Sequence, residues 1–222
     1  MRCNTAGRCF AVRHAHPTFV ACTPANLLTE CFVGCGPPGN CGWAITSPPG
    51  TASFDGVKLN EGSFGASNTG AALKPLLGVM PISDWTLQFK FKEIPVPQTG
   101  NINYYIRIGD PVGNLFEIAL SGNGNALVTK FGGSAFSGPW LPAGGGASHV
   151  VHLTMPPGFG IPATFVDGVL IPLVPGAPFP GIAGPNTLSA NIANADLNGQ
   201  GAYEQIFLTG GIFAPTTKFC CP

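Results

Sequence analysis

The segment Asp84–Lys92 reads DWTLQFKFK and alternates between apolar and polar residues from its second position onward. In an extended chain successive side chains point to opposite sides, so residues two apart share a face. One face of this segment is therefore apolar and the other is polar: Trp85, Leu87, Phe89 and Phe91 against Thr86, Gln88, Lys90 and Lys92. This pattern predicts a β-strand whose apolar face lies in a core.

Segments of the same kind follow along the chain, at residues 102–108, 115–120, 126–131, 149–155, 163–173 and 203–208. The connections between them are rich in turn-forming residues, such as Gly-Asp-Pro at 109–111 and Gly-Asn-Gly at 122–124. No window keeps apolar residues at helical spacing for three turns without a Gly or a Pro. Regularly spaced strands with little helix predict an all-β protein, built as a two-sheet antiparallel sandwich.

The composition excludes several classes of protein. The chain has 222 residues, of which only 9% are charged, and its ten basic residues balance its ten acidic ones. A nucleic-acid-binding protein needs a basic surface to neutralise phosphates, so nucleic acid is not an expected partner. No apolar run approaches the roughly 20 residues of a membrane span. A neutral surface with so few charges gives little repulsion between copies, which favours a subunit of an assembly.

The cysteines divide the chain into two parts. Six lie within the first 41 residues and two close the chain: Cys3, Cys9, Cys22, Cys31, Cys35, Cys41, Cys220 and Cys221. Turn-forming residues at 47–50 mark the end of the cysteine-rich part. We therefore expect a Cys-rich N-terminal arm at residues 1–50 and a main domain at residues 51–219.

Disulfides, zinc and free thiols are alternative states of these cysteines. Zinc sites favour ligand pairs separated by two to four residues, and only Cys31 and Cys35 have such a spacing. We expect all eight cysteines to be disulfide candidates, with no predicted pairing, and we predict no metal site. His14 and His16, which lie near the arm cysteines, would be the best additional metal ligands.

The cysteines and the N-terminus favour different compartments. Many cysteines usually indicate an oxidising environment, but Arg8 and Arg13 interrupt the apolar stretch that a secretory signal requires. A protein that is assembled in the cytoplasm and released by lysis, as a virus particle is, would reconcile the two observations. A removed signal or a bound metal would reconcile them as well.

The main domain resembles laminin-G-like domains, which belong to the concanavalin A-like lectin and glucanase superfamily. The resemblance rests on SFDGVKL at 53–59, WTLQFKFK at 85–92, SHVVHLTM at 148–155, TFVDGVLI at 164–171 and AYEQIFLTGGI at 202–212, in that order. Ser148 stands where the family commonly has Trp. The resemblance spans residues 51–215 and implies a twisted two-sheet jelly roll. It does not imply one function, because this fold carries lectins, hydrolases and adhesion modules.

The carboxylates argue against catalysis by the hydrolases of this superfamily. Those enzymes place two or three carboxylates on one strand, at alternate positions, to act as acid and as nucleophile or base. The chain has five Glu and five Asp, and no two of them lie two or four residues apart. Glu117 is alone on its strand, and the odd spacing of His149 and His152 puts them on opposite faces of theirs. We therefore expect a protein that is not an enzyme and has no cofactor.

Our leading hypothesis is a structural component of a bacteriophage virion, such as a tail, tail-tip or capsid-decorating protein, that contacts copies of itself and other virion proteins. It would be found in the virion, and outside the cell after release. The alternative is a carbohydrate-binding module for a cell-surface glycan. In that case Tyr105 and Trp140, whose rings are expected at the surface, would stack on sugar faces.

Overall fold

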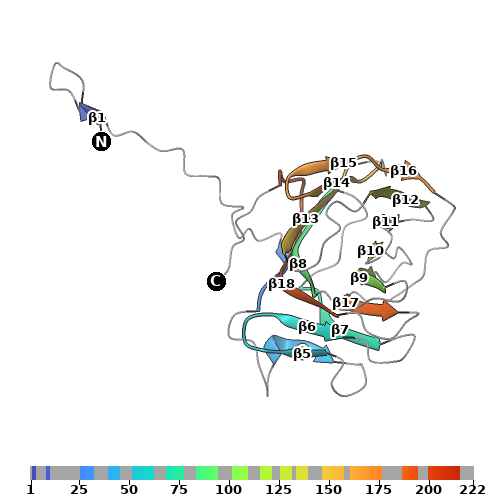
Figure 1. The fold of residues 1–222 in the computed structure, drawn as a ribbon. Coiled ribbons are helices and arrows are strands. Elements are labelled where there is room, and N and C mark those ends of the chain that lie inside the picture. The colour runs from blue at the N-terminus through green and yellow to red at the C-terminus, as the bar shows by residue number, and fades with distance from the viewer. Residues whose placement is uncertain are drawn as a thin grey trace.

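The computed structural model describes residues 2–3, 9–10, 26–32, 40–45, 52–62, 69–77, 84–94, 102–109, 116–121, 126–131, 134–139, 147–157, 161–176, 187–194 and 200–215. These residues form antiparallel strands and one short 3-10 turn, Asn40–Gly42. Two large sheets pack as layers of a sandwich, with β8, β13 and β18 in one layer and β9 to β12 in the other (Figure 1). The predicted all-β jelly-roll sandwich is confirmed.

The first layer, called the β8 sheet here, has the strand order β15-β14-β13-β8-β18-β6-β5. β6 pairs with residues 200–203 of β18, and β3 pairs with residues 205–209 of the same strand. Its strands are β3 (Asn26–Cys31), β5 (Ala52–Phe54), β6 (Leu59–Gly62), β8 (Trp85–Ile94), β13 (Ser148–Met155), β14 (Ala163–Val166), β15 (Val169–Ile171) and β18 (Gln200–Gly210).

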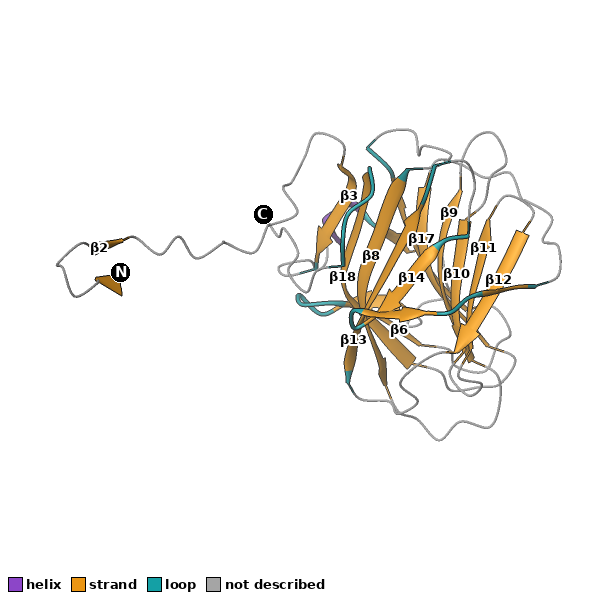
Figure 2. Cartoon of the chain, turned by 90° about the horizontal axis from the view of Figure 1, so that it is seen from above, coloured by secondary structure: helices purple, strands orange, loops and turns teal. Residues whose placement is uncertain are grey.

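The second layer, called the β9 sheet, has the order β16-β12-β11-β10-β9-β17-β7-β4. Its strands are β4 (Ala44–Ile45), β7 (Thr69–Pro75), β9 (Ile102–Gly109), β10 (Phe116–Ser121), β11 (Ala126–Phe131), β12 (Ser134–Pro139), β16 (Val174–Pro175) and β17 (Thr187–Asn194). Figure 2 shows the run of β9, β10, β11 and β12 as neighbouring strands of this layer.

The core lies between the two sheets and follows the alternation of the sequence. Trp85, Leu87, Phe89 and Phe91 of β8 are buried, as are Ile106, Ile108, Phe116 and Ile118 of the facing sheet. The ring of Trp85 meets that of Phe116 edge to face, with 4.9 Å between centroids. Burying each such side chain contributes about 1.5–3 kcal/mol, so this layer of rings and aliphatic chains is the main source of stability.

The first half of the polar face of β8 is buried as well, and this departs from the pattern of a half-exposed strand. Thr86 and Gln88 are almost inaccessible. Residues 211–215, which we call the strap, follow β18 and turn back over Thr86. The Thr86 hydroxyl donates to the Gly211 carbonyl at 2.8 Å and accepts from the Phe213 amide at 3.1 Å. The Gly211 amide donates to the Asp84 carbonyl at 2.6 Å.

Residues from the predicted arm contribute to both sheets. β3 pairs with β18 and β4 pairs with β7. Leu28, Phe32 and Trp43 are part of the core, and the Phe32 ring lies 5.7 Å from the rings of Trp43 and Phe54. The boundary at residue 50 stays a prediction, and an arm independent of the sandwich would be confined to residues before Asn26.

Two observations concern the cysteines. Cys41 is disulfide-bonded, and β1 (Arg2–Cys3) pairs with β2 (Cys9–Phe10) so that Cys3 is directly opposite Cys9. Cys31 lies on β3 opposite Gln205. The other candidates, Cys22, Cys35, Cys220 and Cys221, lie outside the described residues, as do His14 and His16. The remaining pairings stay predictions.

The Val-Asp-Gly motif forms a tight two-residue turn between β14 and β15. Asp167 and Gly168 both have positive φ, 50° and 80°, as a type I′ turn requires. Asp is one of the few non-glycine residues that enter this region at modest cost. In the described part of the chain no helix has the length and apolarity to cross a membrane.

Candidate functional site

The outer face of the β9 sheet carries the candidate site. Ile106 and Ile108 of β9 point into the core, so Arg107 between them points away from it, and its side chain is 43% exposed. In the same way Glu117 lies between the core residues Phe116 and Ile118 of β10. A short hairpin joins the two strands and pairs Glu117 directly with Arg107.

Arg107 and Glu117 form an ion pair across this hairpin. The Arg107 Nε donates to Glu117 Oε2 at 2.6 Å, and the carboxylate side chain is only 2% exposed. A charge-assisted hydrogen bond of this length is stronger than a neutral one. Because the carboxylate is buried, it holds the partly exposed guanidinium in one orientation at the surface of the sheet.

The strand register places a third charged residue in line with this pair. Lys130 of β11 is opposite Glu117, so Lys130, Glu117 and Arg107 form what we call the charged row. Ser189 of β17 continues the row beyond Arg107. Glu117 is the one acidic residue on the eight strands of this sheet. The strands of this sheet therefore carry more basic than acidic residues.

The next row of the sheet contains Tyr105. The backbone of Tyr105 pairs with Ala119 on one side and with Asn191 on the other. This places one of the two predicted sugar-stacking residues two positions from Arg107 on the same strand; the structure does not describe its side chain. The other, Trp140, lies outside the described residues. Both stacking roles stay predictions.

Sequence reasoning missed the link between Arg107 and Glu117. Within β10 the sequence places Glu117 as the single carboxylate of its strand. The available signal was that both residues occupy non-core positions in neighbouring strands joined by a short turn-rich segment. Arg107 lies on the adjacent strand, so the residue pattern of β10 alone does not reveal it as the partner of Glu117.

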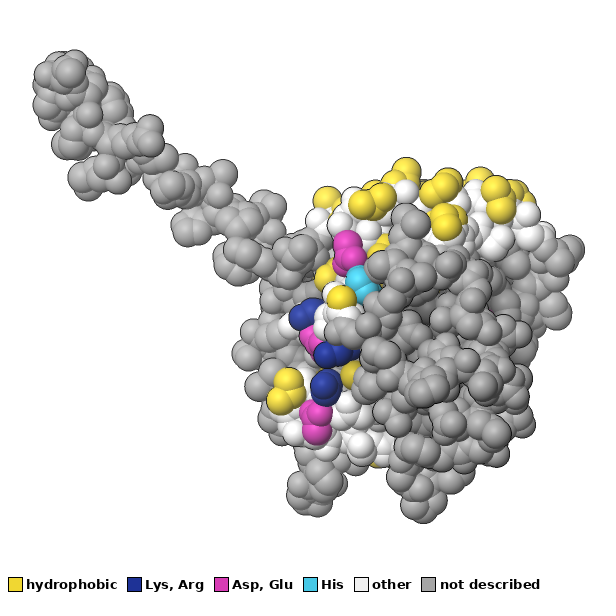
Figure 3. Space-filling model, in the orientation of Figure 1, with side chains coloured by type: hydrophobic (Ala, Val, Ile, Leu, Met, Phe, Trp, Pro, Cys, Tyr) yellow, Lys and Arg dark blue, Asp and Glu magenta, His cyan; other side chains and the backbone are white. Residues whose placement is uncertain are grey.

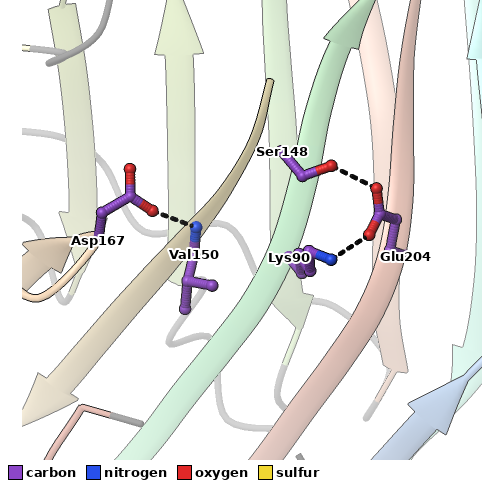
Figure 4. A network of polar contacts seen from close by, with 5 residues as sticks. All are labelled: Lys90, Ser148, Val150, Asp167 and Glu204. Carbon is purple, nitrogen blue, oxygen red and sulfur yellow. Dashed lines mark hydrogen bonds and ion pairs between the residues drawn. The ribbon is translucent and has the colours of Figure 1, made fainter. Parts of the chain in front are cut away.

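A second polar network lies on the outer face of the β8 sheet and joins three strands (Figure 4). Lys90 of β8 and Ser148 of β13 both bind Glu204 of β18, the lysine at 2.6 Å. Burial acts to raise the pKa of Glu204, but the hydrogen bonds from Lys90 and Ser148 lower it below its ordinary value. This network holds the strands together at a bulge in β18.

The two histidines of β13 lie on opposite faces, as their spacing predicts. His149 is opposite Phe91 and contacts Asp167, whereas His152 is opposite Gln88. His152 is buried beneath the strap, 2.6 Å from Gln88 Oε1 and 3.0 Å from the Phe213 carbonyl oxygen. Burial lowers the pKa of His152 to about 4, although the contact with Phe213 acts in the opposite direction. The histidines form no joint site.

An apolar rim lies at one end of the sandwich. It consists of the exposed side chains of Ile161, Val169, Leu170 and Val174, and Figure 3 shows the apolar side chains gathered at the end where β14, β15 and β16 lie. Exposed apolar surfaces of this kind are typical of interaction sites. Self-association of the chain stays a prediction.

A metal centre is not found among the described residues, where no three His, Cys, Asp or Glu side chains come together. This statement does not extend to the arm cysteines and histidines outside those residues.

Comparison of the fold with solved structures identifies its class. No protein-family model and no curated protein matches the sequence. A β-glucanase of Bacillus licheniformis superposes with a TM-score of 0.58 at 11% identity, over 84% of this chain and 99% of that one. The Crh5 transglycosylase superposes with a TM-score of 0.59 at 11% identity, over 86% and 89%. The fold is the concanavalin A-like jelly roll.

Carbohydrate-binding proteins share the same fold. A structure of botulinum neurotoxin type C, whose cell entry depends on two ganglioside molecules, superposes with a TM-score of 0.57 at 12% identity. That match covers 85% of this chain and about half, 49%, of the toxin chain. At such identities the likeness shows the jelly roll and leaves the activity to be argued from the residues.

The comparisons correct one prediction and leave another without support. The prediction that the chain is not an enzyme is contradicted, because the structural neighbours include a glucanase, a transglycosylase and endo-acting O-glycanases. The spacing of carboxylates within one strand does not exclude a carboxylate pair formed between strands. No neighbour supports a phage structural role, so the virion partners and virion location remain predictions, and the carbohydrate-binding alternative agrees better with the neighbours.

Proposed function

We propose that this protein recognises carbohydrate on the outer face of its β9 sheet, with Arg107 as the principal hydrogen-bond donor. The ion pair between Arg107 and Glu117, with its 2.6 Å contact, is the observation that carries the proposal. Solved structures of the same fold that act on or bind glycans support it. A protein that binds cell-surface glycans meets them outside the cell, and this agrees with the extracellular location expected from the cysteines.

The physical reason lies in the fixed geometry of the guanidinium. An arginine side chain loses considerable conformational entropy when a ligand immobilises it, and this loss weakens binding. The buried carboxylate of Glu117 has already oriented Arg107 in the absence of ligand. The guanidinium is planar and has five N–H donors, so it can serve Glu117 and a ligand oxygen at the same time.

Cleavage or transfer of glycosidic bonds at the same surface is a second candidate. Glu117 is a buried carboxylate on a sheet face, and several neighbours of the fold are hydrolases. Glycosidases of the usual kind need two carboxylates flanking the bond. Asp110, which follows β9 directly and lies outside the described residues, is the nearest acidic residue in sequence. Release of reducing sugar that is lost in both E117Q and D110N would establish this activity.

The binding proposal is tested on a glycan array with two matched double variants. R107Q/E117Q removes both charges of the pair, so no buried carboxylate is left without its cation. K90Q/E204Q removes an ion pair of the same length, 2.6 Å, from the other sheet. We expect R107Q/E117Q to lose binding while K90Q/E204Q retains it. Equal binding by wild type and R107Q/E117Q, or no binding to any glycan, would contradict the proposal.

A further inference from the structure

We infer that two copies of this chain associate through β15, which pairs edge to edge with its counterpart about a two-fold axis at Leu170. This inference does not depend on the proposed carbohydrate-binding function. Its basis is the place of β15 at the end of the strand order of the β8 sheet, where it supplies two of the four side chains of the apolar rim.

The backbone of Leu170 is the first step. The two-residue turn at Asp167-Gly168 makes Val166 and Val169 a hydrogen-bonded pair, and such pairs alternate with non-bonded ones along an antiparallel ladder. Leu170 and Phe165 are therefore a non-bonded pair, so the N–H and C=O of Leu170 point away from β14. Among the described strands β14 is the one neighbour of β15, and both groups thus face an open sheet edge.

The side chains along this edge are the second step. Val169 and Leu170 are 56% and 57% exposed, and Ile161 and Val174 complete the apolar rim. Figure 3 shows apolar side chains gathered at this end of the molecule. Proteins usually protect a sheet edge with charged side chains or with a covering segment. β15 has no charged residue, and the exposure of its first two residues shows that no segment covers them.

Charge and symmetry identify the partner as a second copy. Asp167 is the one charged residue from position 161 to position 176, so two such edges approach each other with little repulsion. In antiparallel pairing about Leu170, the Leu170 N–H of each copy donates to the Leu170 carbonyl of the other. The two Asp167 residues are then six positions apart, about 20 Å, which exceeds the Debye length of about 8 Å in physiological salt.

Pro172 limits the association to two copies. It follows β15 directly and has no N–H, so it cannot donate to a ladder that extends beyond Ile171. A two-fold contact uses the same edge on both copies and therefore closes on itself. The rim is small compared with an interface of about 1,200 Å², so we expect a weak dimer with a Kd of about 10–1,000 µM.

Sedimentation velocity of the full chain, from about 1 µM to about 500 µM, tests the association. We expect the wild type to change from monomer to dimer with rising concentration and to stop there. L170K places two like charges opposite each other at the axis, so it should weaken dimerisation about tenfold to a hundredfold. L77K adds the same charge at a leucine that is 81% exposed after β7, and it should dimerise as the wild type does. Circular dichroism confirms that each variant is folded.

Hydrogen exchange distinguishes backbone pairing from a contact of side chains alone. The Leu170 amide should exchange more slowly as the protein concentration rises, because the other copy then accepts its hydrogen bond. The Val169 amide already bonds to Val166 within the hairpin, so its exchange should change much less.

Four results would overturn the inference. The first is a chain that stays monomeric up to about 500 µM. The second is a dimer that L170K does not weaken, or that L77K weakens equally, because the contact would then lie elsewhere. The third is growth beyond the dimer, which a closed two-fold contact does not allow. The fourth is a dimer in which the exchange of the Leu170 amide is unchanged.

Discussion

His149 Nδ1 lies 2.8 Å from Asp167 Oδ2, and this contact ties the β14–β15 turn to the beginning of β13. The same aspartate accepts a hydrogen bond from the Val150 amide at 2.9 Å through Oδ1 (Figure 4), and its own amide donates to the Val150 carbonyl at 2.9 Å. Two of the segments behind the family resemblance, 148–155 and 164–171, are therefore physically joined. They stabilise one edge of the β8 sheet and lie outside the proposed glycan surface.

Replacing Asp167 by alanine should destabilise the fold. The substitution removes both side-chain hydrogen bonds and puts a residue that disfavours positive φ at a φ of 50°. We expect a loss of about 1–3 kcal/mol in the free energy of unfolding, measured by urea denaturation. Asn tolerates this backbone conformation, so D167N should lose less than D167A. Equal stability of D167A and wild type would show that the turn does not depend on this side chain.

Thr164 and Thr86 should respond in opposite directions to the same substitution. Thr164 is fully buried between Leu153 and Ile171, and its hydroxyl has no hydrogen-bond partner among the described residues. T164V removes a buried polar group of the same shape and should stabilise the protein by about 1 kcal/mol. T86V should destabilise it by about 1–3 kcal/mol, because the Thr86 hydroxyl bonds the strap at Gly211 and Phe213. Thermal melting measures both, and a lower Tm for T164V would argue against an unsatisfied hydroxyl.

Acidification should loosen the strap through His152. Its pKa is about 4 in the folded protein and 6.5 without the fold, so the folded state favours the neutral ring. The stabilisation is complete above pH 6.5 and is lost as the pH falls from 6.5 toward about 4, a loss of about 3 kcal/mol. The pKa of Glu204 is lowered, so its contribution is lost only at more acidic pH.

This pH dependence is checked by urea denaturation from about pH 7 down to about pH 5, above the range in which carboxylates protonate. H152Q cannot take up a proton, so its stability should change much less over this interval. Hydrogen exchange at the Phe213 amide should be faster at low pH than at neutral pH in the wild type, once the rates are corrected for the pH dependence of intrinsic exchange. A flat stability profile for the wild type would show that His152 does not titrate with unfolding.

Gly138 should not accept a side chain. A Cβ at this position would lie 2.8 Å from Ile171 Cγ2 and 2.8 Å from the Pro172 carbonyl oxygen. Pro172 lies between β15 and β16, where the chain passes from one sheet to the other. G138A should therefore cost about 1–3 kcal/mol in unfolding free energy, as overpacking does. S137A, at the neighbouring position of β12, is the control and should stay close to wild type.

The period-two patterns of the sequence predicted β8, β9, β10, β11, β13 and β18, and for β8, β9 and β10 also the side that forms the core, whereas β3, β7, β12 and β17 were not predicted. Leu87, Phe89, Ile106 and Ile118 are buried as their alternation requires, and Asp167-Gly168 forms the turn that this dipeptide favours. These features depend on local geometry, because extended backbone alternates its side chains whatever the neighbours are. For the same reason the opposite placement of His149 and His152 followed from their spacing alone.

Long-range contacts decided the rest. Gln88 and His152 are on the polar face of their strands, but both are buried. His152 contacts Gln88 and also the strap, which comes more than fifty residues later than β13. Leu28 and Phe32 belong to the core because β3 pairs with β18 at the far end of the chain. Arg107 and Glu117 meet only through the register of their hairpin, and Lys130 joins their row through the next strand. Each strand's own pattern shows which way its side chains point, whereas strand order and register, which are tertiary properties, determine which side chains come together.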